Sequence, residues 1–275
     1  MRISAPLAPL LAAALGLGLF LAAPAAARAS GDLRVCADPD YLPYSDRAGK
    51  GFENQVASYV AQALGDHLVY YWYTTRGPGG YSQFLTDTLY KKKCDVVMDI
   101  PYAADAVLTT RPYYISSYVF VFDKKKNYDI TSLDSPALRN LKLGFEADTP
   151  VEDGLKLRSL IYHAVAFDTA DAPGVSSAAI LDAVKHGQIQ VGLTWEPAIG
   201  AFLRDYPNLD IVSIPNSRAL GSPEQYSFPM SMGVRNNDAS LHNKLNYVIA
   251  RDKTALTEIL TRNGVKLYTP SVAVQ

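Results

Sequence analysis

The sequence of 275 residues contains 26 basic and 27 acidic side chains, which gives a formal net charge of −1. With this balance and without a basic patch, the sequence argues against nucleic acid or an anionic membrane surface as a partner. A chain of this length can bury a large core or divide into two lobes.

Residues 1–29 carry the pattern of a secretory signal peptide. Arg2 supplies a short positive region, Leu7–Leu21 form an apolar stretch, and Ala27-Arg28-Ala29 give an A-x-A cleavage site. The alternative is an uncleaved membrane anchor, but the apolar stretch of about 15 residues is shorter than the roughly 20 that span a bilayer. We therefore expect cleavage near Ala29 and a soluble protein in the periplasm.

Strand and helix patterns alternate between residues 31 and 122. Such alternation predicts an open, mainly parallel sheet flanked by helices, with ligands bound beyond the carboxyl ends of the strands. That rule brings the loops Asp38–Ser45 and Asp99–Tyr102 to one rim. The predicted elements are the strands Leu33–Ala37, Leu68–Tyr73 and Asp95–Ile100 and the helices Phe52–Leu64 and Ser82–Lys91.

A second unit follows the aromatic segment 108–122, and the chain returns through the predicted strand Phe228–Val234 to two C-terminal helices. This order resembles the two-lobed fold of the type II periplasmic solute-binding proteins, in which two hinge strands join the lobes. We predict that residues 30–122 begin the first lobe, that residues 123–227 form the second, and that residues 228–275 complete the first. The strands predicted in the second lobe are Lys142–Phe145, Gln190–Thr194 and Leu209–Ile214.

The two cysteines are Cys36 and Cys94. An oxidising compartment favours a disulfide, but Cys36 lies near the end of one predicted strand and Cys94 at the start of another. If these strands are parallel neighbours, the two Cα atoms lie roughly 10 Å apart, beyond the ~7 Å that a disulfide tolerates. The sequence therefore favours two free thiols over a Cys36–Cys94 disulfide. No His or Asp stands at a metal-ligand spacing from either cysteine, so we expect no metal site there.

Aromatic and charged residues gather on the loops and strand ends that are predicted to border a cleft. Tyrosine offers contact area with a polar tip, which suits a cleft or an interface, although several tyrosines must also be framework. The acidic residues can attract a cationic or polar guest or hold a hard cation, or they can serve turns and helix starts. The candidates for contact with a ligand or partner are Asp38, Tyr41, Tyr44, Glu53, Arg76, Asp99, Tyr102, Arg111, Tyr113, Glu146, Trp195 and Glu196.

Catalysis is not predicted. The four histidines are scattered among predicted helices and loops, without the order of a catalytic triad or the spacing of a zinc site. Glu196 could act as an acid only if its pKa were raised. We therefore expect a binding protein that is not an enzyme and uses no cofactor.

Amino-acid receptors of this fold bind the ligand carboxylate with an arginine shortly before the first hinge, because its planar fork contacts both oxygens. In this sequence Ala103, Ala104 and Ala106 occupy that region, and only Arg111 remains, beside the hinge proline. The sequence therefore disfavours an ordinary amino-acid receptor.

Five motifs of the sequence are VCADPDYLPYSDRAGKGFEN, KCDVVMDIP, LTTRPYYISSYVFV, LKLGFEADTP and GLTWEPAIG. Together they resemble those of the MxaJ/XoxJ family, periplasmic proteins encoded with the methanol dehydrogenases that use pyrroloquinoline quinone (PQQ). The resemblance implies interaction with a PQQ methanol dehydrogenase, dependent on calcium or a lanthanide, and a role in its maturation or activation. The alternative is the receptor of an ABC transporter for a small polar solute, and the sequence leaves both the MxaJ and the XoxJ type open.

Overall fold

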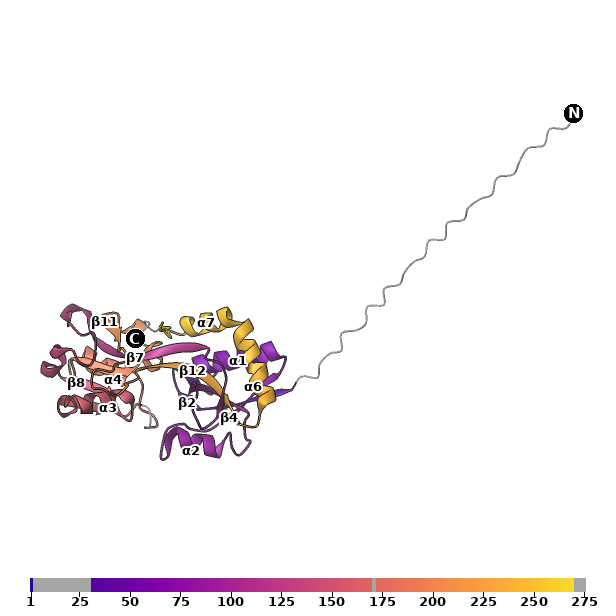
Figure 1. Cartoon of the computed structure of the whole chain (residues 1–275), viewed down its shortest axis with the longest axis horizontal. Coiled ribbons are helices and arrows are strands. Elements are labelled where there is room, and N and C mark those ends of the chain that lie inside the picture. The colour runs from indigo at the N-terminus through magenta and orange to yellow at the C-terminus, as the bar shows by residue number, and fades with distance from the viewer. Residues whose placement is uncertain (2–30, 170–171, 270–275) are drawn as a thin grey trace. The chain divides into compact units, whose positions relative to one another are not determined.

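The structure is a computed structural model and describes residue 1, residues 31–169 and residues 172–269. The predicted signal peptide and its cleavage site therefore lie outside the described residues, apart from Met1. Figure 1 shows two groups of helices and strands after Gly31, and the strands β7 and β12 run between these groups.

The first lobe is built on the strand order β4–β1–β5–β12. Strand β1 pairs in parallel with β4 and β5, whereas β12 runs antiparallel to β5 and also pairs with the short β6. Apolar side chains of α1, α6 and α7 cover one face of this sheet, and those of α2 cover the other. The bounds are β1 Asp32–Ala37, α1 Phe52–Leu64, β4 His67–Trp72, α2 Gly80–Asp87, β5 Val96–Pro101, β6 Leu108–Thr109, β12 Ser227–Val234, α6 Ala239–Arg251 and α7 Lys253–Arg262.

The second lobe is built on the order β7–β10–β8–β9, with β11 on the other side of β7. The side chains of β7 alternate as expected for a strand covered on both faces: Phe120 packs in the cluster of α3, and Val121 in that of α4. The bounds are β7 Tyr114–Asp123, β8 Leu143–Glu146, α3 Pro150–Leu157, β9 Ala164–Phe167, α4 Ala179–Lys185, β10 Val191–Trp195, α5 Glu196–Ile199 and β11 Leu209–Ser213. Short 3-10 turns lie at Lys124–Lys126, Pro136–Asn140, Ile161–His163 and Leu203–Asp205.

Strands β7 and β12 are the hinge strands, because they connect the two sheets. Residues Tyr114–Ser117 of β7 pair with β12, and the residues from Tyr118 onward pair with β10 and β11. This arrangement is the two-lobed type II periplasmic-binding-protein fold, so the predicted fold class is confirmed. The lobe boundaries at residues 122 and 227 stay predictions.

The loop that carries Tyr41 and Tyr44 is held against the start of α1. It contains a small hairpin, β2 (Asp40–Tyr41) with β3 (Ser45–Asp46). The Asn54 side chain accepts hydrogen bonds from the backbone amides of Asp46 and Gly51, at 2.9 and 3.2 Å. Gly51 is needed here because a Cβ atom on it would lie 2.0 Å from the Tyr44 carbonyl oxygen. The loop therefore has a fixed position over the first lobe.

Cys36 and Cys94 form a disulfide with a Cα–Cα distance of 5.4 Å, so the expectation of two free thiols was wrong. That expectation placed Cys94 in an extended strand, but β5 starts only at Val96, and Cys94 belongs to the turn before it. The spacing of about 3.3 Å per residue along a strand does not apply across a turn. The chain can therefore bring Cys94 back over the end of β1.

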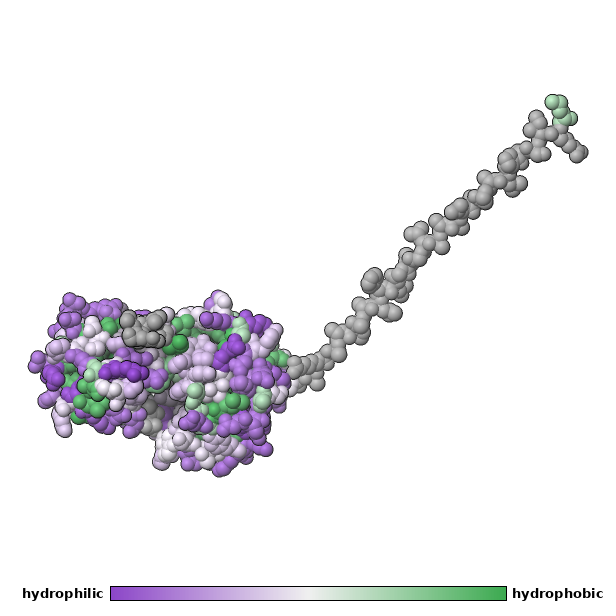
Figure 2. All heavy atoms as spheres, viewed as in Figure 1, coloured by the Kyte–Doolittle hydropathy of each residue, from purple (hydrophilic) through white to green (hydrophobic). Residues whose placement is uncertain are grey.

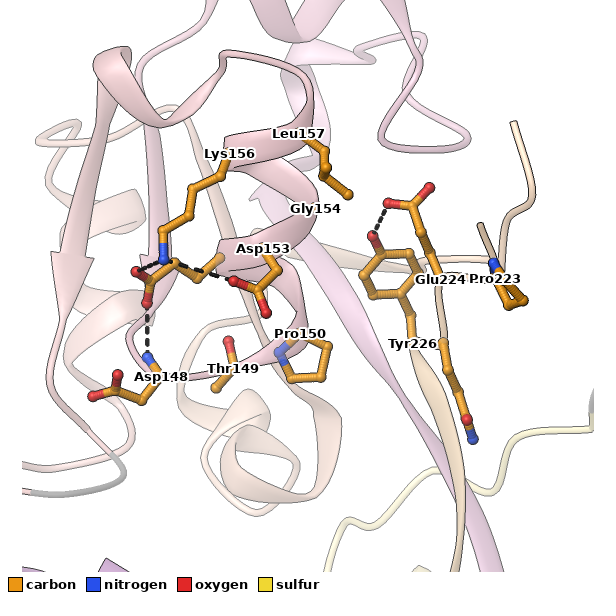
Figure 3. Close-up of a pocket in the computed structure, with 12 residues that line it drawn as sticks. Asp148, Thr149, Pro150, Asp153, Gly154, Lys156, Leu157, Pro223, Glu224 and Tyr226 are labelled. Carbon is orange, nitrogen blue, oxygen red and sulfur yellow. Dashed lines mark hydrogen bonds and ion pairs between the residues drawn. The ribbon is translucent and has the colours of Figure 1, made fainter. Parts of the chain in front are cut away.

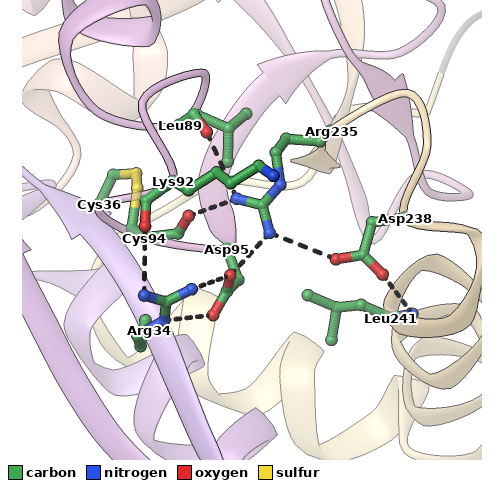
Figure 4. A network of polar contacts seen from close by, with 9 residues as sticks. All are labelled: Arg34, Cys36, Leu89, Lys92, Cys94, Asp95, Arg235, Asp238 and Leu241. Atoms are coloured by element: carbon green, nitrogen blue, oxygen red, sulfur yellow. Dashed lines mark hydrogen bonds and ion pairs between the residues drawn. A yellow bond between two sulfur atoms is a disulfide. The ribbon is translucent and has the colours of Figure 1, made fainter.

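A network of ion pairs surrounds this disulfide (Figure 4). Asp95 accepts hydrogen bonds from Arg34 of β1, at 2.6 and 2.7 Å, and from Arg235 after β12, at 2.7 Å. Arg235 also donates to the carbonyl oxygens of Leu89 and Cys94. The turn between α2 and β5 is thereby fixed to both of its neighbouring strands.

The face seen in Figure 2 is mainly hydrophilic, with hydrophobic side chains in small, separate areas. Among the residues that the structure describes, no helix has both the length and the apolar composition needed to cross a membrane.

Candidate functional site

The best candidate for a functional site is the cleft between the lobes, which consists of two neighbouring cavities of about 490 and 190 Å³. The two cavities share part of their wall, because four residues line both of them, namely Tyr41, Tyr44, Tyr81 and Asp99. The larger cavity is also lined by residues of the second lobe and the hinge strands, namely Tyr118, Glu146, Asp148, Thr149, Pro150, Trp195, Phe228 and Met230. The smaller one extends into the first lobe along Asp38, Ser45, Glu53 and Thr75.

Aromatic rings form two groups at the cleft. In the first lobe, the ring centroids of Tyr41 and Tyr44 lie 4.8 Å apart. At the hinge, Trp195 lies 5.1 Å from Tyr118 and 6.0 Å from Phe228, centroid to centroid. Because these rings pack on one another, their positions are set before any guest enters.

Two of the cleft carboxylates are saturated with hydrogen bonds from the protein. Asp38 accepts from the backbone amide of Thr75 at 2.7 Å, from the Thr74 and Thr75 hydroxyls, and from the Asp40 amide. Glu146 is buried and accepts from the backbone amide of Trp195 and from the hydroxyls of Thr169 and Thr194. Both residues therefore hold loops and strand ends around the cleft.

Asp99 and Glu53 accept fewer hydrogen bonds from the described protein than Asp38 and Glu146 do. Burial raises the pKa of Asp99 to about 7, although the hydrogen bond that it accepts from the Tyr114 hydroxyl at 2.8 Å acts in the opposite direction. Burial, together with the charges of Asp99 and Asp38, raises the pKa of Glu53 well above its usual range. Within the described residues, no side chain or amide donates a hydrogen bond to the Glu53 carboxylate. Ionising two neighbouring acids in this position costs free energy unless a positive group lies beside them.

No lysine, arginine or histidine is among the described residues that line the two cavities. Arg76, a buried candidate, lies behind the Tyr41 ring, with its guanidinium 4.6 Å from the ring centroid. It donates to the backbone carbonyl of Asp40 and, across the lobes, to those of Ala172 and Val175 at 3.4 and 3.3 Å. Its Nε atom is buried and has no hydrogen-bond partner in the part of the chain that the structure describes. Arg76 therefore connects the lobes but does not line the cavities.

Seven of the twelve predicted contact residues line the cleft, namely Asp38, Tyr41, Tyr44, Glu53, Asp99, Glu146 and Trp195. Their role in binding stays a proposal. The sequence analysis did not single out Tyr81, Phe228 or Met230. The signal for the last two was the second hinge strand, because every second residue of a strand that crosses between lobes faces the same side.

The other predicted contact residues lie elsewhere. Tyr102 is exposed, and Tyr113 is buried and donates its hydroxyl to the Met98 carbonyl at 2.7 Å. Arg111 is held through its backbone amide by Asn246. Glu196 accepts hydrogen bonds from Ser116 and from the backbone amide of Lys266, and burial raises its pKa to about 7. Glu196 thus joins the first hinge strand to the C-terminal segment.

Among the described residues, no group of three or more His, Cys, Asp or Glu side chains is arranged to hold a metal ion. The acids of the cleft line its two cavities together with tyrosines.

A further cavity of about 510 Å³ lies on the second lobe, between α3 and residues 223–226 (Figure 3). Its charged groups already have partners: Lys156 pairs with Glu152 at 2.7 Å, and Glu224 accepts a hydrogen bond from Tyr226 at 2.7 Å. Glu224 also forms an ion pair with the buried guanidinium of Arg158 at 2.6 Å. With its charges satisfied internally, this groove is a weaker candidate than the cleft.

Comparisons with known proteins agree with the two-lobed fold. No protein-family profile matches the sequence. The protein MoxJ of Methylorubrum extorquens is 32% identical over 259 residues, which cover 89% of this chain and 84% of MoxJ. The crystal structure of MxaJ from Methlophaga aminisulfidivorans MPT has a TM-score of 0.76 at 24% identity and covers 86% of this chain and 100% of MxaJ. The periplasmic binding protein XoxJ of Methylobacterium extorquens AM1 has a TM-score of 0.68 at 30% identity and covers 86% of this chain and 99% of XoxJ.

Proposed function

The chain belongs to the family of MoxJ, MxaJ and XoxJ, periplasmic-binding-protein-like proteins associated with methanol oxidation, and from this membership we propose that it binds a PQQ-dependent methanol dehydrogenase. In this proposal the protein acts in the periplasm, after removal of residues 1–29, and helps the dehydrogenase to mature or become active. The type of dehydrogenase, calcium-dependent or lanthanide-dependent, is not part of the proposal.

The single observation that carries this proposal, beyond family membership, is a formed cleft without a carboxylate clamp. No basic side chain is among the described residues that line it. An ordinary amino acid would bring a carboxylate to Asp99, Glu146 and Asp148, which would repel it. The cleft therefore supports a task other than amino-acid capture, such as contact with a partner protein.

Co-purification tests the partner. The mature protein, residues 30–275, is immobilised and exposed to periplasmic extract, and the retained proteins are identified by mass spectrometry. We expect the quinoprotein methanol dehydrogenase to be retained, and a strain without the gene to lose dehydrogenase activity while keeping the dehydrogenase polypeptide. Retention of no dehydrogenase, together with normal activity in that strain, would overturn the proposal.

A second candidate function is the receptor of an ABC transporter for a small polar solute other than an ordinary amino acid. The cavity of about 490 Å³ between the lobes favours it, because that space suits a small molecule. A solute present at 100 times its dissociation constant would add about 2.7 kcal/mol to the free energy of unfolding. Thermal unfolding with a panel of polar solutes therefore separates this function from the first.

We do not propose an enzymatic role. No histidine is among the described residues that line the cleft, and its acids occur with tyrosines whose pKa values burial raises further, such as Tyr44 and Tyr81. These hydroxyls remain protonated donors at neutral pH. Such a lining suits binding better than proton transfer to a substrate.

A further inference from the structure

Acidic side chains line the cleft, and no basic side chain is among its described lining residues. Asp38, Glu53 and Asp99 line the smaller cavity, and Asp99, Glu146 and Asp148 line the larger one. Asp38 and Glu146 are neutralised in part by hydrogen bonds from hydroxyls and amides, as described above. The Glu53 carboxylate receives no such hydrogen bond within the described chain, and Asp99 receives one, from Tyr114. A positively charged guest would favour ionisation of both acids.

The aromatic walls specify the guest further. Aromatic rings line the larger cavity together with Asp99, among them those of Tyr41, Tyr44, Tyr81, Trp195 and Phe228. The faces of such rings attract cations, with the largest effect when water is excluded. The Tyr41 ring already carries the Arg76 guanidinium at 4.6 Å from its centroid, so the position of this ring favours a positive neighbour.

We propose that the cleft binds an organic cation, an ammonium or guanidinium group, with Asp99 and Glu53 as its counter-charges and the cleft tyrosines and Trp195 as its walls. This inference rests on the proposed function only for the source of the cation. The cation is either the side chain of a lysine or arginine on the partner protein or a free amine. The chemistry of recognition is the same in both cases.

Two other classes of guest fit less well. A metal ion requires several oxygen ligands in one shell, and no group of three or more candidate ligands is present among the described residues. An anion requires a positive group, and none lines the cavities in the described part of the chain. An organic cation needs only one or two carboxylates and an aromatic wall, and the cleft has both.

Binding of the cation depends on pH. The titratable groups that interact with Asp99 are Glu53 from α1, Tyr81 from α2, Tyr44 from the loop before α1, Tyr113 directly before β7, and Tyr114 of β7. The tyrosines stay neutral at these pH values because burial raises their pKa. Asp99 loses its proton as the pH rises through about 7, and the pKa of Glu53 is also raised, by burial and by the charges of Asp99 and Asp38. We therefore expect tighter binding of the cation at pH 8 than at pH 6.

Isothermal titration calorimetry with the mature protein tests the proposal. The probes are methylammonium, Nα-acetyl-lysine amide, Nα-acetyl-arginine amide, calcium chloride and sodium acetate. At least one of the three organic cations should bind, and D99N and E53Q should weaken that binding about 10-fold or more, because each removes a charge next to the cation. D153N is the matched control, since Asp153 lies on α3 and lines the groove of Figure 3 but neither cavity of the cleft. Melting temperatures establish that the variants are folded.

The outcomes decide between the sources of the cation. If a free amine prevents retention of the dehydrogenase, the cation is a side chain of the partner, and if it binds without affecting retention, the cation is a small molecule. If a cation binds but no dehydrogenase is retained, the inference stands and the proposed function fails. Three results would overturn the inference. The first is that none of the three organic cations binds, and the second is that D99N and E53Q bind the cation as tightly as the wild type does. The third is that calcium or acetate binds more tightly than the organic cations.

Discussion

The Tyr114 hydroxyl donates a hydrogen bond of 2.8 Å to Asp99, and this contact joins the first hinge strand to the acidic centre of the cleft. Asp99 is a half-buried residue near the end of β5, whereas Tyr114 is the first residue of β7. The ionisation of Asp99 and the position of the hinge are therefore coupled through one side chain. A guest that neutralises Asp99 acts directly beside the strand that joins the lobes.

The first prediction concerns the pH dependence of stability. Because burial raises the pKa of Asp99 to about 7 in the folded protein, Asp99 keeps a proton that it loses in the unfolded chain near its usual pKa of about 3.9. The folded state thus loses stability as the pH rises from about 4 to 7, and the loss is complete above pH 7. Asn in D99N cannot ionise. In urea unfolding, the free energy of unfolding of D99N should exceed that of the wild type by more at pH 8 than at pH 5.

The control for this prediction is E258Q, because Glu258 lies on α7, away from the cleft. Its stability should follow that of the wild type across the pH range. A constant difference between D99N and the wild type at both pH values would mean that Asp99 is ionised throughout, contrary to the burial seen in the structure.

The second prediction concerns the disulfide. The bond between Cys36 and Cys94 closes a loop across a sequence separation of 58 residues. A crosslink over a loop of this length lowers the entropy of the unfolded chain by an amount worth about 4 kcal/mol. The variant C36A/C94A should lose a free energy of unfolding of that order in urea. Dithiothreitol should destabilise the wild type during unfolding and leave the double variant unchanged, and an equal effect on both proteins would contradict the prediction.

The third prediction concerns the contact between the lobes. Arg76 of the first lobe donates to the carbonyl oxygens of Ala172 and Val175 in the second. R76M keeps the length of the side chain but removes its donors, at a cost of about 1–3 kcal/mol. We expect a larger radius of gyration by small-angle X-ray scattering, because the lobes separate. R139M, at an exposed arginine of the second lobe, should leave the radius unchanged, and equal radii for R76M and the wild type would show that Arg76 does not hold the lobes together.

The fold was predictable from the sequence because helices and strands alternate with clear periods. The residues Leu245, Val248 and Ile249 mark the buried face of α6, and Leu256, Ile259 and Leu260 mark that of α7, as the spacing predicts. Local patterns were sufficient there, since one face of each helix packs on the first sheet.

The candidate site was predictable only in part, because it depends on contacts between distant segments. The rule for parallel sheets placed Asp38 and Asp99 on one rim, but no local pattern shows that Arg76 contacts carbonyls almost a hundred residues away. The disulfide was missed for a related reason. Whether Cys94 lies inside a strand or in the turn before it is a boundary of one or two residues, and that boundary decides the distance to Cys36.

The last prediction concerns Gly51, which precedes α1. An added Cβ atom would lie 2.0 Å from the Tyr44 carbonyl oxygen and 2.5 Å from the Ser45 amide nitrogen, both of them backbone atoms that cannot rotate away. G51A must therefore displace the loop that carries Tyr41 and Tyr44, and we expect a loss of about 2–4 kcal/mol in the free energy of unfolding. S58A, on the exposed side of the same helix, should change the free energy of unfolding by less than about 1 kcal/mol. Because the displaced tyrosines line the cleft, G51A should also weaken binding of an organic cation, whereas S58A should bind it like the wild type. Wild-type stability of G51A in urea would show that the loop can move freely, and the cleft could then not be regarded as formed before its guest arrives.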